Sequence, residues 1–75
     1  MPHIQVKLLE GKTEAQKQEL TKALIEAAQK VIGFGEESYS VSIEDFSLQS
    51  WEDKVYPQDI MGDESILYKT PGYSM

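Results

Sequence analysis

Residues His3 to Leu9 alternate between polar and apolar side chains, with Ile4, Val6 and Leu8 on the apolar side. This alternation predicts a strand with one buried face. The segment Glu10-Gly11-Lys12 that follows is typical of a turn, because its glycine permits backbone conformations that other residues avoid.

A long helix is predicted from about Glu14 to Ile32, because apolar residues recur there at intervals of three and four. Thr13 and Gln16 form the pattern of a capping box at its start. Gly33 supplies a left-handed stop at its end. The expected apolar stripe consists of Leu20, Leu24, Ala27, Ala28, Val31 and Ile32.

A second alternating run follows the helix, with Tyr39, Val41 and Ile43 on its apolar side. Strand, helix and strand within this length predict an α+β fold, a βαβ unit with two parallel strands and a right-handed crossover. Two strands under one helix leave sheet edges unpaired and one face poorly covered. Pairing with a second copy of the chain would address both problems.

The remainder of the chain has a weaker pattern. Residues 50–53 are expected to form a turn or the remnant of a strand, and Pro57 interrupts the segment. Asp63 is expected to cap a short C-terminal helix that continues through Tyr68. Because no linker or internal repeat is visible, residues 1–75 are expected to form a single domain.

Size and charge limit the partners of the chain. Seventy-five residues bury a small core, and without cysteine no disulfide can supplement it, so we expect a homo-oligomer. The net charge is −6, with nine acidic residues and one lysine between Glu36 and Glu64. Such a surface repels nucleic acid and anionic membranes. With no leader and no run near ~18 apolar residues, we expect a cytoplasmic protein.

Few residues are suited to chemistry. His3 is the single histidine, so no conventional metal site is expected, and its place on the polar side indicates an exposed strand residue. The carboxylates are interpreted as a solvated face.

Removal of Met1 would turn Pro2 into an N-terminal secondary amine. An α-amino group titrates near ~7.7–8.0, and burial on the apolar side would lower its pKa toward a value useful for proton transfer. Taken by itself, the pattern favours a proline that merely starts a strand, where its missing N–H donor does no harm.

The opening PHIQVKLLEGKT, from Pro2 to Thr13, resembles the start of the 4-oxalocrotonate tautomerase family, and the tail from Lys69 to Met75 resembles its longer PptA subfamily. The resemblance implies a dimer, favoured over a hexamer, in which four strands form one sheet covered by two helices. It implies a keto-enol tautomerase without a cofactor, with Pro2 as acid/base catalyst. Lys12 would hold a substrate carboxylate, and Trp51 would line the pocket and keep Pro2 desolvated.

Two positions depart from the family pattern. Lys12 stands where an arginine is common, and a lysine grips a carboxylate less directionally. Ser40 stands where isomerases of unsaturated diacids carry a second arginine, and a serine cannot neutralise a second carboxylate. The small-molecule substrate implied is therefore a monoacid of the enolpyruvate or dienol type.

Two other functions stay open from the sequence. A non-catalytic βαβ dimer whose acidic face binds a basic partner would explain the charge run and would need nothing from Pro2. A retained Met1 would favour this interaction module. Hydration or dehalogenation of a haloacrylate would keep the fold, but the chain has no arginine to help activate water.

Overall fold

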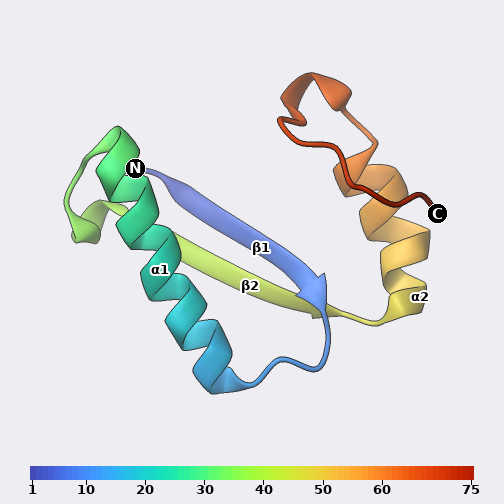
Figure 1. Cartoon of the computed structure of the whole chain (residues 1–75), viewed down its shortest axis with the longest axis horizontal. Helices are drawn as coiled ribbons and strands as arrows, with labels where there is room; N and C mark the ends of the chain where they lie inside the picture. The colour runs from blue at the N-terminus through green and yellow to red at the C-terminus, as the bar shows by residue number, and fades with distance from the viewer. The chain divides into compact units, whose positions relative to one another are not determined.

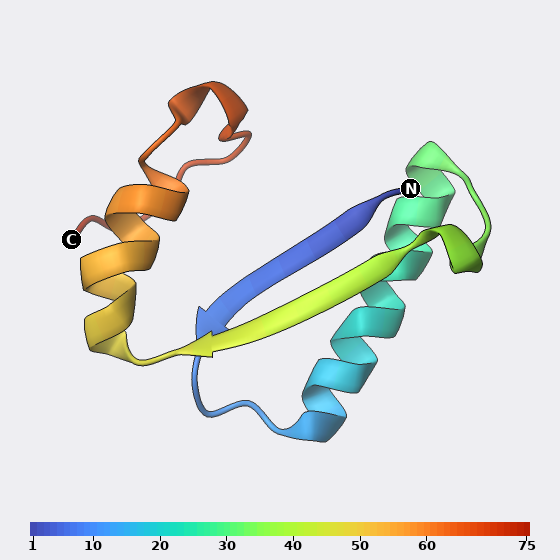
Figure 2. The ribbon, with the colours of Figure 1, turned by 180° about the vertical axis from the view of Figure 1, so that it is seen from behind.

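Strands β1 (His3–Leu9) and β2 (Ser40–Phe46) form a two-stranded sheet, and both arrows point the same way in Figures 1 and 2. Helix α1 (Glu14–Ile32) lies between them in the chain. The predicted βαβ unit with two parallel strands and one long helix is therefore confirmed. The Ser40 amide donates to the Pro2 carbonyl oxygen at 3.2 Å, which places Pro2 at the end of the sheet where β2 begins.

The computed structural model describes all residues from Met1 to Met75, and they divide into two compact units, Met1–Asp45 and Phe46–Met75. The first unit holds β1, α1, a short 3₁₀ segment η1 (Glu36–Ser38) and nearly all of β2. The second holds helical segments and the C-terminal tail. None of the helices combines the length and apolar character needed to cross a bilayer.

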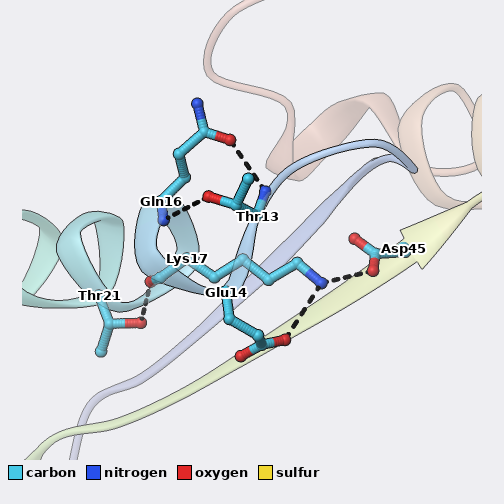
Figure 3. Close-up of polar contacts among 6 residues, drawn as sticks. All are labelled: Thr13, Glu14, Gln16, Lys17, Thr21 and Asp45. Atoms are coloured by element: carbon cyan, nitrogen blue, oxygen red, sulfur yellow. Dashed lines mark hydrogen bonds and ion pairs between the residues drawn. The ribbon is translucent and has the colours of Figure 1, made fainter.

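Both ends of α1 are closed as the sequence predicts. The Thr13 hydroxyl accepts from the Gln16 amide at 3.1 Å, and the Thr13 amide donates to the Gln16 side chain at 2.9 Å (Figure 3). This reciprocal pair is a complete capping box. At the other end Gly33 has a φ of 83° and donates its amide to the Gln29 carbonyl at 3.0 Å. Glycine adopts this φ without steric cost.

The apolar stripe of α1 is wider than the surface that the sheet covers. Leu20, Leu24 and Ala28 are half-buried, but Val31 is 84% exposed and Ile32 is 55% exposed. Ala27 is exposed as well, so a single chain covers only part of the predicted apolar stripe. Two strands are too narrow to cover more of the helix, and much of its apolar surface stays in contact with water.

The second unit is more helical than the sequence pattern predicts. A turn of helix α2 (Leu48–Ser50) leads into the π-helix η2 (Trp51–Ile60), so the prediction of a turn or strand remnant is wrong. The Ser47 hydroxyl caps this segment by accepting from the Ser50 amide at 3.1 Å. Because a π-helix turns more widely than an α-helix, its apolar residues do not show the usual helical spacing.

A short 3₁₀ segment η3 (Glu64–Ile66) follows η2. Asp63 caps it, because its carboxylate accepts from the Ser65 amide at 3.1 Å. The predicted cap is thus confirmed, but the helix ends at Ile66 rather than continuing through Tyr68. One capped turn is all that this polar, glycine- and proline-bounded segment supports.

Candidate active site

Pro2 lies one residue before β1 and is half-buried, as are Ile4 and Val6 further along the strand. Its carbonyl is held by the Ser40 amide, which fixes the start of the chain against β2. Met1, by contrast, is fully exposed. The nitrogen of Pro2 thus occupies a defined place at one end of the sheet, on the side where apolar residues gather.

The opposite face of the sheet carries a small polar cluster at the same end. Ring nitrogen Nδ1 of His3 lies 2.6 Å from Ser40 Oγ, and Nε2 lies 3.3 Å from Ser42 Oγ. All three residues are exposed, so the interpretation of His3 as an exposed strand residue is confirmed. Its bonds to two serines were not predicted, although all three occupy polar positions of their strands. The Ser40 hydroxyl is consequently already engaged.

Lys12 lies in the turn between β1 and α1, immediately before the N-cap of the helix. The turn depends on Gly11, whose φ of 115° is costly for any residue with a side chain. Lys12 is exposed and borders a shallow pocket of about 130 Å³. The pocket is lined by Leu8, Lys12, Gln16, Lys17 and Leu20. A leucine wall beside an ammonium group suits a small organic anion.

Pro2 precedes β1 and Lys12 follows it, so the two residues lie beyond opposite ends of this strand. Figure 1 shows the course of β1. The seven residues of this strand span roughly 20 Å, at about 3.3 Å per residue. That distance exceeds the length of a small enol acid. By this estimate, the backbones at Pro2 and Lys12 of one chain lie farther apart than such a molecule is long.

Lys17 ties α1 to the end of β2. Its Nζ donates to Asp45 at 2.5 Å and lies 3.8 Å from Glu14, while its side chain is 17% exposed (Figure 3). The hydrogen bond to Asp45 raises the pKa of Lys17 above its ordinary value near 10.5; attraction by both carboxylates adds to this, and partial desolvation opposes it. The sequence held a signal for this pair, because Asp45 is a charged residue on the helix-facing side of β2.

Trp51 begins η2 in the second unit and is half-buried. Its indole Nε1 donates to the Tyr73 hydroxyl at 3.0 Å. The Phe46 ring meets the indole edge-on, with ring centroids 6.2 Å apart. No sequence pattern indicated that Tyr73 would return to Trp51, because the two residues are 22 positions apart.

No group of three or more histidine, cysteine, aspartate or glutamate side chains is arranged to hold a metal ion. The described groups offer anion binding by an ammonium group and aromatic contact, and the Pro2 nitrogen is an amide as long as Met1 is attached.

Comparison with known proteins gives a consistent result. The family model described as tautomerase enzyme matches residues 2–54. A protein of Xylella fastidiosa (strain 9a5c) named "Probable tautomerase" is 41% identical over 73 residues, or 97% of this chain and 89% of that protein. The 2-hydroxymuconate tautomerase of Bacillus subtilis (strain 168) is 42% identical over 45 residues, or 60% of this chain and 73% of the relative.

A solved structure shows the same fold. TomN, described as a 4-oxalocrotonate tautomerase homologue in the tomaymycin biosynthetic pathway, superposes with a TM-score of 0.64 and 34% sequence identity. The match covers 67% of this chain and 77% of TomN. The family match, the relatives and the βαβ fold agree: this chain belongs to the 4-oxalocrotonate tautomerase family, and its activity is that of a tautomerase, an isomerase.

Proposed function

We propose that this tautomerase works without a cofactor and uses the amine of Pro2, released by removal of Met1, as its acid/base group. The position of Pro2 carries the proposal: it is half-buried and anchored through its carbonyl, while Met1 is exposed to a processing peptidase. The neutral amine takes the proton from the enol hydroxyl. The resulting ammonium returns a proton to carbon, which leaves the ketone and restores the amine.

The separation of Pro2 and Lys12 supports a site shared between two copies of the chain. The sheet order β1-β2 leaves the outer edge of β1 unpaired. Antiparallel pairing of two such edges about a twofold axis brings the Lys12 turn of each copy toward the Pro2 end of the other. The exposed apolar residues of α1, such as Val31, give a second reason for association. The tail's resemblance to the PptA subfamily favours a dimer over a hexamer.

The substrate we propose is a monoacid with an apolar end, such as an arylenolpyruvate. Lys12 would bind its one carboxylate, and Trp51 would contact the remainder. Two further polar groups are closed to a second carboxylate. Ser40 lies on the polar face of the sheet, opposite Pro2, and bonds His3, and the Trp51 N–H bonds Tyr73. A second carboxylate would therefore lose its hydration without gaining matched partners, at a substantial cost.

The decisive experiment compares Met1-free protein with protein that retains Met1, using phenylenolpyruvate as the probe. In the retaining form the Pro2 nitrogen is an amide without a basic lone pair, so turnover should be lost while the fold stays intact. Met1-free protein should be active, with a pH profile that reports a group at or below the ordinary α-amino range near ~7.7–8.0.

Mass spectrometry of the amino terminus and circular dichroism provide the controls for purity and folding. Equal turnover by both forms would rule out Pro2 as the catalytic base. Absence of turnover by either form, with this probe and with unsaturated diacids, would favour the alternative of a non-catalytic interaction module.

A further inference from the structure

The C-terminal tail returns to the start of η2, where Tyr73 meets Trp51. The hydroxyl of Tyr73 accepts from indole Nε1 at 3.0 Å. An indole has one N–H donor and no other group that forms conventional hydrogen bonds. This single contact therefore satisfies the only strong polar group of Trp51 and leaves carbon surface as the remainder of the ring.

Two more aromatic rings fix this arrangement. Phe46 meets the indole edge-on, with an interplanar angle of 80°. Tyr56, one turn further along η2, packs against Tyr73 with ring centroids 5.8 Å apart and an interplanar angle of 40°. Tyr73 is thus held in place by the ring of Tyr56, and its hydroxyl accepts a hydrogen bond from the indole. Tyr73 can therefore fix the orientation of the Trp51 ring.

We propose that Tyr73 is a positioning residue that sets the orientation of Trp51 and, through it, the preference for an apolar substrate end. The specificity part rests on the proposed function, in which Trp51 contacts the substrate. An indole with an unoccupied N–H could donate to a second carboxylate. With that N–H bonded to Tyr73, Trp51 offers only apolar surface, and a dicarboxylate gains nothing from it.

The test uses Tyr73→Phe, which removes the hydroxyl and keeps the ring beside Tyr56. Trp51 is the single tryptophan of the chain, so fluorescence excited at wavelengths that its four tyrosines do not absorb reports the environment of Trp51 alone. Tyr73→Phe should lower the fluorescence anisotropy and shift the emission maximum. KM for phenylenolpyruvate should rise about two- to tenfold with kcat nearly unchanged, as expected for loss of one hydrogen bond. The ratio of kcat/KM for monoacid over diacid should fall.

Tyr68→Phe is the matched control, because Tyr68 is 98% exposed and lies in the same unit. It should change neither fluorescence nor KM. A double-mutant cycle adds Trp51→Phe, which has no N–H donor. In that background Tyr73→Phe should have no further effect on KM.

Unchanged fluorescence in Tyr73→Phe, or full additivity in the cycle, would overturn the positioning role. An unchanged substrate ratio despite altered fluorescence would overturn the specificity role. Absence of turnover by the Met1-free parent would refute the proposed function instead. The fluorescence comparison would then decide by itself whether Tyr73 holds Trp51.

Discussion

Lys12 occupies an exposed turn that owes its shape to Gly11, and it borders a pocket with a leucine wall. Its long side chain can reach a ligand outside the chain that carries it. A lysine offers a compact charge rather than a planar fork, so it tolerates several carboxylate orientations. This tolerance fits a substrate whose orientation is set mainly by its apolar end.

Lys12→Ala should lower kcat/KM for phenylenolpyruvate about 10- to 100-fold, mainly through KM, because a hydrogen bond to a charged group is lost. Lys12→Arg should retain most of the activity and lower KM through bidentate contact. Steady-state kinetics measures both effects. Lys22→Ala, a change of an exposed lysine on α1, is the control and should have no effect. An unchanged KM in Lys12→Ala would remove Lys12 from the site.

At the scale of elements, α1 is joined to the sheet through both its first turn and its inner face. The capping box at Thr13 fixes where the helix starts, directly after Lys12. One turn further on, Lys17 reaches across to Asp45 near the end of β2. Together they position the turn that carries Lys12 relative to both strands, so the candidate anion site rests on ordered elements.

Lys17→Met should lower the free energy of unfolding at neutral pH, and this loss of stability should become smaller at strongly alkaline pH. Because the pKa of Lys17 is raised in the folded state, the stabilisation is fully present below the ordinary value near 10.5 and is lost as pH rises through the folded-state pKa. The difference in unfolding free energy between wild type and variant, measured with urea, should stay constant from pH 7 up to the ordinary pKa near 10.5. At higher pH, this difference in unfolding free energy should become smaller. A difference that stayed constant through pH 11.5 would contradict this role, and Lys22→Met should show no such pH dependence.

At the scale of the whole molecule, β1 separates the proposed catalytic amine from the proposed anion site by roughly 20 Å. The chain also leaves apolar helix surface exposed, including Val31 and Ile32. A twofold dimer would account for both observations. It would cover apolar surface of α1, and it would form two sites, each with Pro2 from one copy and Lys12 from the other. Stability and activity should then depend on protein concentration in the same way.

Subunit complementation tests the shared site. Met1-retaining protein and Met1-free Lys12→Ala protein are each impaired, but a mixed dimer contains one intact site, with Pro2 from one copy and Lys12 from the other. Random reassociation of a 1:1 mixture after mild unfolding should restore about one quarter of the wild-type activity. A site within one chain would give no gain over the two parents. Light scattering should confirm that the mixture is dimeric; a stable monomer at micromolar concentration would contradict the assembly.

Much of the first unit could be predicted from the sequence, because local patterns control it. The alternation of polar and apolar residues predicts β1 and β2, and the helical spacing of apolar residues predicts α1. The start of α1 is predicted by the capping box of Thr13 and Gln16, which spans only four residues. The family resemblance was also visible there, since the segment from Pro2 to Thr13 is continuous. Such features depend on neighbours in sequence, and each residue type carries its own backbone preference.

Tertiary structure decided which distant residues meet. The bonds of His3 to Ser40, Lys17 to Asp45 and Trp51 to Tyr73 join residues 22 to 37 positions apart, and they depend on strand register and on how the tail folds back. The π-helix was hidden because its wider turn does not produce the usual spacing. The separation of Pro2 from Lys12, by contrast, follows from the extended geometry of β1, which the alternation of residues already predicts. Residues that lie close together in the sequence, such as Pro2 and Lys12, can therefore belong to two different proposed sites, because an extended strand separates them in space.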